Sequence, residues 1–456
     1  MSILIKNGNV VLDDKIKQCD LLIKDEKIIK IDENIVSEAD TVIDAKDKFV
    51  LPGGVDVHTH MNLDLGEYIS VDDFYTGTIA AAHGGTTTIV DHIGALDRGS
   101  SLKSMISHYH DLANGKAVID YSFHGALYEL NDNLLNEISD LYDEGIVSVK
   151  IYTTYSGKLD DGEMLRVLKK AKETGTVVCV HCENDKVIEQ LRNEAIREGN
   201  LEPVFHAKTR PQETEAEAIN RLIYLSEMAD YPKLYIVHTS SKKGLDEIKF
   251  ARKRGVKNLY CETCTQYLTL DETKYIEGGN EEAIKYIMAP PLRKKEDIEA
   301  LWQGIKDGDV DVIATDHCPF NYKKDKLPHK DNFINCPGGA PGVEERLEVV
   351  ITEGLKRDIS LVKIVKLLST NPSKIFGMYP HKGEIKIGAD ADLVVLEQDN
   401  YTIKEENRHS NCDYTSYENY VSAVKVDVVI ARGKVIVNND LLLGEKGRGK
   451  FVPRKF

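Results

Sequence analysis

The sequence predicts an α/β protein: a (β/α)₈ TIM barrel with a small β-sandwich domain that is built from both chain termini. Two observations support this fold. The middle of the 456-residue chain alternates short apolar segments with helical patterns, and both ends are rich in strand patterns. A closed parallel barrel uses ~250 residues as one unit. We therefore expect residues 1–52 and 378–456 to form the β-sandwich and a tail, and residues 53–377 to form the barrel.

Both ends of the chain show the two-residue alternation that is typical of half-buried strands. It occurs in residues 2–12 and 19–31 near the start, and in residues 383–397 and 428–439 near the end. The simplest interpretation is that these segments pair with one another beside the central domain.

Eight short apolar segments in the middle of the chain are the expected barrel strands. They are residues 55–60, 86–92, 118–125, 148–154, 177–183, 234–240, 259–264 and 311–318. Helical patterns lie between them, as in residues 162–175 and 243–255. An open doubly wound sheet is the alternative, but the even number of strands and the lack of a Gly-rich dinucleotide turn disfavour it.

Composition and charge exclude several kinds of partner. The 59 basic and 75 acidic residues give a net charge of −16, which repels nucleic acid and acidic membrane surfaces. No apolar run reaches the ~18 residues of a membrane span, and the start lacks an export signal. We therefore expect a cytoplasmic protein with eight reduced cysteines. The pairs Cys179–Cys182 and Cys261–Cys264 are too far apart for a zinc ribbon, so buried thiols are expected.

Metal-binding types of side chain occur near the ends of several predicted strands. They are His58, His60, Lys150, His181, His238 and Asp316. Because barrel active sites form at the carboxyl ends of the strands, we expect these side chains to converge. Residues two apart share a strand face, so the imidazoles of His58 and His60 would point at one ion. Hydrogen bonding at the barrel mouth is the alternative for that pair alone, but the joint pattern predicts a metal centre.

Lys150 lies in an apolar strand segment, Ser148-Val149-Lys150-Ile151-Tyr152. A protonated amine beside two cations would be strongly repelled. Reaction with CO₂ would turn the amine into an anionic carbamate, whose two oxygens would bridge ions ~3.5–4 Å apart. The alternative is a lysine that pairs with an acidic residue inside the barrel.

Together these segments resemble the cyclic amidohydrolase family, and most closely its dihydropyrimidinase and D-hydantoinase branch. The likeness is carried by HTH at 58–60, SVKIY around Lys150, His181, His238, ATDHCPF at 314–320, and residues 371–396. It implies that two divalent ions, most often zinc, are bound. The implied ligands are His58, His60 and Asp316 for one ion, His181 and His238 for the other, and carboxylated Lys150 (N6-carboxylysine) as the bridge.

The resemblance also implies an activity, the hydrolysis of a hydantoin or dihydropyrimidine ring to an N-carbamoyl amino acid. Asp316 would be the general base, and Tyr155 would donate a hydrogen bond to the developing oxyanion. The alternative for Tyr155 is a loop tyrosine that packs on the surface. The implied partners are a small cyclic amide and further copies of the chain in a homotetramer.

Two positions depart from the family's ring-binding pattern. Ala289 stands where the family has a serine, and Gly338 stands where it has an asparagine. These contacts come largely from the main chain in the family, so the N–H and C=O groups here would still serve. A bulkier or differently substituted ring is one explanation of the two changes. The loop residues Leu63, Leu65, Tyr152 and Leu159 would suit an apolar or aromatic substituent.

Several other functions remain open. Allantoinase, or another hydrolase of a purine-derived ring, is one alternative, and an enzyme that cleaves an acyclic bond is another. Dihydroorotase is disfavoured because Asn62 stands where that family has an arginine. A non-catalytic assembly protein on the same fold is disfavoured because every ligand position is filled. The tail, residues 444–456, resembles an arm that docks on a neighbouring subunit, and a solvated basic tail is the alternative.

Overall fold

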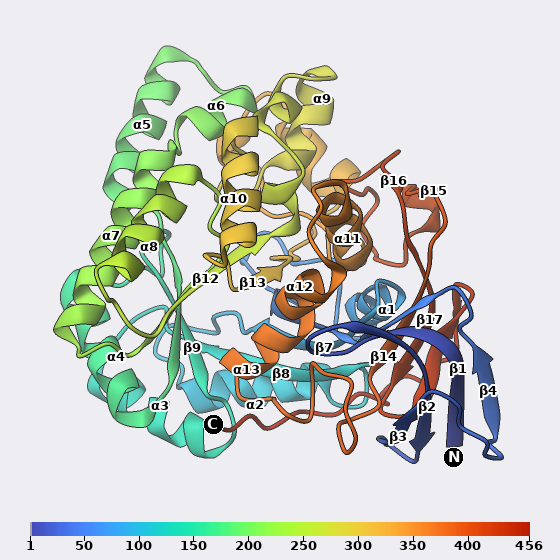
Figure 1. Ribbon diagram of the computed structural model, residues 1–456. Coiled ribbons are helices and arrows are strands. Elements are labelled where there is room, and N and C mark those ends of the chain that lie inside the picture. Colours follow the sequence, from blue (N-terminus) through green and yellow to red (C-terminus); the bar gives the residue numbers. More distant parts are fainter. Residues whose placement is uncertain (1) are drawn as a thin grey trace.

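The computed structural model describes residues 2–456. Its larger part is an eight-stranded barrel (Figure 1). Its strands are β6 (Gly54–Thr59), β7 (Thr86–His92), β8 (Asp120–Ala126), β9 (Ser148–Tyr152), β10 (Val177–His181), β11 (Lys233–Ile236), β12 (Leu259–Cys264) and β13 (Val312–Ala314). Each strand pairs in parallel with the next along the chain. A parallel bridge between Thr59, at the end of β6, and His317, just after β13, brings the first and last strands together. The predicted (β/α)₈ barrel is confirmed.

Helices cover the outside of the barrel (Figure 1). The helices are α1 (Thr76–His83), α2 (Leu102–Ala113), α3 (Asp132–Asp143), α4 (Asp161–Thr174), α5 (Asp185–Glu198), α6 (Val204–Lys208), α7 (Gln212–Met228), α8 (Lys242–Lys253), α9 (Gly279–Ala283), α10 (Lys295–Asp307), α11 (Arg346–Lys356), α12 (Leu361–Val365) and α13 (Asn371–Ile375). All residues of β7 and β8 are buried, as expected for strands covered on both faces.

Helix α4 illustrates how the sequence sets these elements. Asp160 and Glu163 form a reciprocal capping box at its start, which satisfies two main-chain N–H groups. Its buried residues, Met164, Val167, Leu168 and Ala171, follow the three-and-four spacing of one helix face. Gly175 ends the helix at φ 80°, a left-handed conformation that favours glycine.

The two ends of the chain form a second, nine-stranded sheet at the side of the barrel (Figure 1). Its strands are β1 (Ser2–Val11), β2 (Ile16–Lys24), β3 (Lys27–Asp32), β4 (Thr41–Asp44), β5 (Phe49–Pro52), β14 (Leu393–Glu397), β17 (Lys425–Ala431), β18 (Lys434–Asn438) and β19 (Leu441–Leu442). The order is β19-β18-β17-β14-β5-β1-β2-β3, with β4 as a branch on β1. Antiparallel pairing of β5 with β14 joins the two ends, as predicted. A separate two-stranded ribbon consists of β15 (Tyr401–Thr402) and β16 (Val421–Ser422).

A buried charge cluster connects the terminal sheet to the barrel. Lys382 Nζ lies 2.7 Å from Asp120 Oδ2 and 2.6 Å from Asp392 Oδ2. Arg432 also donates to Asp120, at 2.9 Å. Because Asp120 begins barrel strand β8 and Arg432 follows sheet strand β17, the cluster links the two sheets across their boundary.

The C-terminal tail packs on the barrel of its own chain, and its end, marked C in Figure 1, lies beside α3. The Tyr121 N–H donates to the Lys450 carbonyl at 3.0 Å, and the Val452 N–H donates to the Tyr121 carbonyl at 2.7 Å. Arg454 is buried and donates to Ser122 Oγ at 2.9 Å. The tail therefore extends the hydrogen bonding of β8 within its own chain, and a contact of the tail with a neighbouring subunit stays a prediction.

All eight cysteines are buried, and none is paired within residues 2–456, as expected for buried thiols. No helix in the described part of the chain is long and apolar enough to cross a membrane.

Candidate active site

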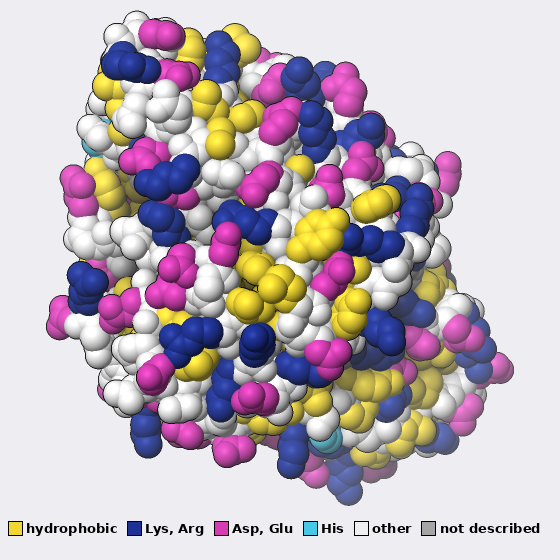
Figure 2. All heavy atoms as spheres, turned by 90° about the vertical axis from the view of Figure 1, so that its left-hand side faces the viewer, with side chains coloured by type: hydrophobic (Ala, Val, Ile, Leu, Met, Phe, Trp, Pro, Cys, Tyr) yellow, Lys and Arg dark blue, Asp and Glu magenta, His cyan; other side chains and the backbone are white. Residues whose placement is uncertain are grey.

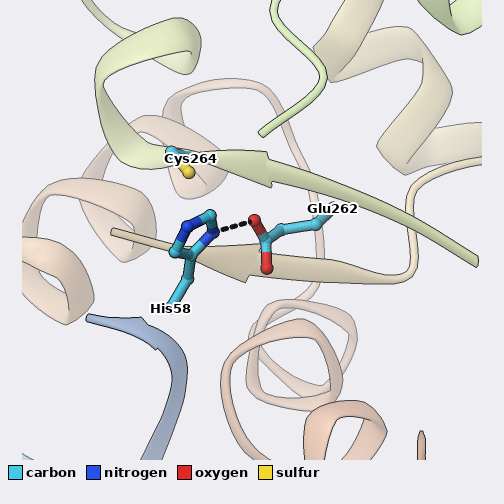
Figure 3. Close-up of side chains that lie close together, drawn as sticks. All are labelled: His58, Glu262 and Cys264. Atoms are coloured by element: carbon cyan, nitrogen blue, oxygen red, sulfur yellow. Dashed lines mark hydrogen bonds and ion pairs between the residues drawn. The ribbon is translucent and has the colours of Figure 1, made fainter. Parts of the chain in front are cut away.

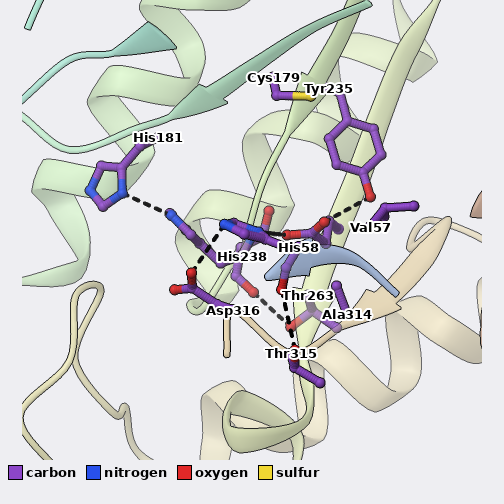
Figure 4. A network of polar contacts seen from close by, with 12 residues as sticks. Val57, His58, Cys179, His181, Tyr235, His238, Thr263, Ala314, Thr315 and Asp316 are labelled. Carbon is purple, nitrogen blue, oxygen red and sulfur yellow. Dashed lines mark hydrogen bonds and ion pairs between the residues drawn. The ribbon is translucent and has the colours of Figure 1, made fainter. Parts of the chain in front are cut away.

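The predicted metal-binding residues lie at one end of the barrel, where its strands finish. His58 is in β6 and Lys150 is in β9, while His181 is the last residue of β10. His238 and Asp316 follow β11 and β13, and each has a positive φ, 37° and 55° respectively. Such φ values are uncommon outside glycine and are found preferentially at functional sites. Figure 4 shows the side chains of His58, His181, His238 and Asp316 meeting in one polar network.

Asp316 contacts both histidines of the HTH motif. Its Oδ1 lies 3.0 Å from His58 Nε2 and 3.1 Å from His60 Nε2. The Nδ1 atom of His60 is buried and has no hydrogen-bond partner within residues 2–456. Ligand atoms of these three residues are close enough together to bind a single cation.

A second pair of imidazoles lies beside this group. His181 Nδ1 and His238 Nε2 are 2.8 Å apart. Lys150 adjoins the first group, with Nζ 3.5 Å from His58 Nε2, and its side chain is fully buried. The structure therefore brings all six residues to the wall of one pocket.

Burial and neighbouring charges together shift the pKa values in this cluster. It lowers the pKa of Lys150, although the charge of Asp316 opposes the shift. Burial would also lower the pKa of His58, but the carboxylates of Asp316 and Glu262 raise it to about 9. The pKa of His238 falls well below its usual value because of burial and the neighbouring His181. A buried amine with a lowered pKa is closer to the neutral, nucleophilic form than an exposed lysine is.

Glu262 supports the site from β12 and was not predicted from the sequence. Its Oε1 accepts hydrogen bonds from His58 Nδ1 at 2.7 Å (Figure 3) and from the His238 N–H at 2.8 Å. Its Oε2 accepts from the Tyr235 hydroxyl at 2.8 Å. Because Glu262 binds His58 Nδ1, it leaves Nε2 facing Asp316, the arrangement in which an outer carboxylate orients a metal-binding histidine.

Glu183 and Arg210 play the same supporting part for His181 and were also missed. His181 Nε2 lies 2.8 Å from Glu183 Oε2, which accepts from Arg210 Nη1 at 2.5 Å. Burial alone would raise the pKa of Glu183, but Arg210 and His181 lower it to about 2. An acidic residue within or directly after an apolar strand, as in LYCETC and VVCVHCE, was the available signal for both carboxylates.

The pocket above these residues has a volume of about 430 Å³. Leu63, Leu65 and Tyr152 line it, whereas Leu159 is buried in the core and does not. Tyr155 also lines the pocket, with its ring centroid 5.0 Å from that of His181 and a positive φ of 73°. Desolvation raises the pKa of the Tyr155 hydroxyl, which therefore stays protonated and able to donate a hydrogen bond.

Ala289 and Gly338, the two positions that depart from the family's pattern, both line this pocket. A Cβ added at Gly338 would meet no atom within 4 Å. A side chain would therefore fit there, and its absence leaves additional space in the pocket.

Comparison with known proteins agrees with this geometry. The amidohydrolase family model matches residues 49–436. The chain belongs to the amidohydrolase family. This hydrolase is 42% identical to the D-phenylhydantoinase of Escherichia coli strain K12 / DH10B over 458 residues, which cover 100% of the chain and 98% of that relative.

Solved structures of other amidohydrolases resemble the whole chain. The dihydropyrimidinase from Brevibacillus agri is 40% identical with a TM-score of 0.97, and the match covers 100% of this chain and 99% of that one. The L-hydantoinase (dihydropyrimidinase) from Arthrobacter aurescens is 28% identical with a TM-score of 0.90, and the match covers 99% of each chain.

Proposed function

We propose that this protein hydrolyses a cyclic amide, a hydantoin or dihydropyrimidine ring, to an N-carbamoyl amino acid. The observation that carries the proposal is the meeting of His58, His60, Lys150, His181, His238 and Asp316 at one pocket. Relatives named as D-phenylhydantoinase and dihydropyrimidinase match the full length of the chain and support the same chemistry.

The donor atoms at the site fit two divalent metal ions. Imidazole and carboxylate ligands suit zinc, which we propose, and also manganese, iron or cobalt. His58, His60 and Asp316 would hold one ion, and His181 and His238 the other. Two ions held in this way would lower the pKa of a water molecule and polarise an amide carbonyl.

Lys150 is proposed to carry a carboxyl group on Nζ and to bridge the two ions. Its amine would form an N–C bond to CO₂ and lose a proton, which gives an anionic carbamate with two ligand oxygens. The low exposure of Lys150, 1%, and its lowered pKa support this, because CO₂ reacts with the neutral amine. An anion here would also offset the charge of the ions.

Asp316 and Tyr155 are proposed as the groups that handle the proton and the oxyanion. Asp316 would accept a proton from the attacking water and deliver it to the leaving ring nitrogen. Burial would raise the pKa of Asp316, but His58 lowers it well below its usual value, so the proton would be held briefly. The Tyr155 hydroxyl would donate to the developing oxyanion, and losing one such donor typically slows a reaction by ~10²–10³.

Main-chain groups of Ala289 and Gly338 are proposed to bind the amide edge of the ring. The space beside Gly338 favours a bulkier ring or substituent than a side chain at this position would admit. Leu63, Leu65 and Tyr152 would contact an apolar or aromatic part of the substituent. Burial of these surfaces against the ligand would favour binding.

We also propose that the protein is a homotetramer and that it is located in the cytoplasm. Figure 2 shows a face on which apolar side chains lie among interspersed acidic and basic ones. Tyr224, Met228 and Phe250 are exposed on the helices of the barrel and would gain from an interface. Unpaired cysteines support a reducing compartment. Light scattering on the purified protein would test the subunit number.

Ring-opening kinetics on a small panel of compounds test the proposed function. The panel is dihydrouracil, hydantoin, phenylhydantoin, allantoin and dihydroorotate, each assayed with zinc-loaded protein. We expect turnover of hydantoins or dihydrouracil, with N-carbamoyl amino acid as the product. Turnover of allantoin alone would favour allantoinase, and no turnover of any compound by fully loaded protein would refute the proposal.

A further inference from the structure

A positively charged side chain in the pocket wall has no acidic partner among residues 2–456. Arg192 lies on α5 and lines the pocket together with Tyr155, Arg210 and Ile334. Its Nη2 donates to the Ile334 carbonyl oxygen at 3.2 Å. In the described chain, residues 2–456, no carboxylate forms an ion pair with this guanidinium.

Three carboxylates near Arg192 are each paired with another cation. Glu183 accepts from Arg210 at 2.5 Å. Asp185 lies 3.1 Å from Lys158 Nζ, and Glu189 lies 2.6 Å from Lys186 Nζ. The positive charge of Arg192 therefore remains uncompensated within the pocket wall.

Burial and a neighbouring arginine both disfavour the positive charge of Arg192. The side chain is half-buried, and burial together with the nearby Arg210 lowers its pKa. Arg210 itself is engaged by Glu183, so Arg192 is the guanidinium that is left to meet a ligand. An anion at this position would be favoured by direct contact and by relief of the repulsion between the two arginines.

We propose that Arg192 binds a carboxylate at the far end of the ring substituent, so that the preferred substrates are cyclic amides with an anionic side chain. This inference rests on the proposed ring-opening function and specifies its substrate class. A guanidinium forms paired hydrogen bonds to a carboxylate. Leu63 and Leu65 would contact the apolar stem between the ring and the carboxylate.

The net charge of the protein supports an anion-binding role for Arg192. The chain carries −16 overall and would repel an anionic compound at most of its surface. An unpaired cation that faces the reaction pocket is the feature expected if a negatively charged substrate has to be bound there. Neutral hydantoins would make no use of it.

A pair of substrates that differ mainly in charge tests the proposal. We would compare 5-(2-carboxyethyl)hydantoin with its neutral amide, 5-(2-carbamoylethyl)hydantoin, using the zinc-loaded enzyme. The wild-type ratio of kcat/KM, acid over amide, should exceed one and should fall as salt is added. Arg192→Gln should lower this ratio about tenfold, mainly through KM, since the contact is remote from the reacting carbonyl.

Two further variants separate charge from structure. Arg192→Lys should keep part of the preference because it keeps the charge. Arg197→Gln removes an exposed arginine from the same helix and should leave the ratio unchanged. Because the ratio compares two substrates of one variant, it cancels any general loss of activity.

The outcomes are distinguishable. A wild-type ratio of one or less, or a ratio that Arg192→Gln leaves unchanged, would overturn the role of Arg192. If hydantoin and the amide are opened without preference for the acid, only this inference fails. If no ring is opened at all, the proposed function fails and this inference fails with it.

Discussion

Replacing Glu262 by glutamine should weaken metal binding ~10–100-fold while it preserves the fold. Glu262 accepts hydrogen bonds from His58 Nδ1 at 2.7 Å, the His238 N–H at 2.8 Å and the Tyr235 hydroxyl at 2.8 Å. Glutamine has the same shape and keeps one acceptor oxygen. It lacks the negative charge that orients His58 and makes its imidazole a better ligand.

The size of the effect follows from these contacts. A hydrogen bond to a charged group contributes about 1.5–3 kcal/mol and one between neutral groups about 0.5–1.5 kcal/mol. Loss of the charge therefore costs about 1 kcal/mol per bond, or roughly 3 kcal/mol shared between folding and metal binding. Glu262→Ala would also leave the buried donors without an acceptor, at about 1–3 kcal/mol each. This variant should be markedly unstable, since domains are stable by only about 5–15 kcal/mol.

Competition between the protein and a zinc chelator measures the metal affinity, and thermal denaturation measures the fold. Glu345→Gln is the matched control, because Glu345 is equally buried and bonds Thr415 rather than a histidine of the site. Wild-type zinc affinity in Glu262→Gln would refute the reasoning. An equal loss of affinity in Glu345→Gln would also refute it.

Other substitutions test the site and the fold. Lys150→Ala should lose bound metal and ring opening, and retention of both in metal analysis and assay would exclude a bridging carbamate. Lys382→Met should lower stability by about 3–5 kcal/mol, because the buried Asp392 loses its cation; an unchanged melting temperature would contradict this. In chelated protein, Glu183 has a folded pKa of about 2 against an ordinary value of 4.5. Its contribution, about 3 kcal/mol, is present above pH 4.5 and is lost as the pH falls towards 2. Denaturant titrations of Glu183→Gln should show a weaker pH dependence over that range, and profiles identical to wild type would be inconsistent with it.

The sequence predicted the barrel strands well where both faces are packed. Residues 86–92 and 259–264 coincide with β7 and β12. The predicted strands 234–240 and 311–318 are longer than β11 and β13. The left-handed conformations of His238 and Asp316 end the two extended segments before these predicted metal-binding residues are reached. Apolar patterning carries no signal for a conformation that tertiary contacts impose.

The residues around the metal-binding set were harder to predict than the set itself. The two-residue spacing of His58 and His60 at the end of a predicted strand is visible in the sequence. Glu262 is 204 positions from His58 in the chain, so only the closed barrel brings the two together. The buried position of Arg454 against the barrel was likewise not predictable. A basic tail is expected to lie in solvent, and only the folded structure shows its hydrogen bonds to β8.

We propose above all that one barrel end holds two metal ions joined by a modified lysine. Anomalous diffraction at the zinc edge, from crystals of zinc-loaded protein, tests it most directly. We expect two peaks ~3.5–4 Å apart, one beside Asp316 and one beside His181, with density that extends from Lys150 Nζ to both. A single peak, or an unmodified Lys150 that contacts neither ion, would contradict it.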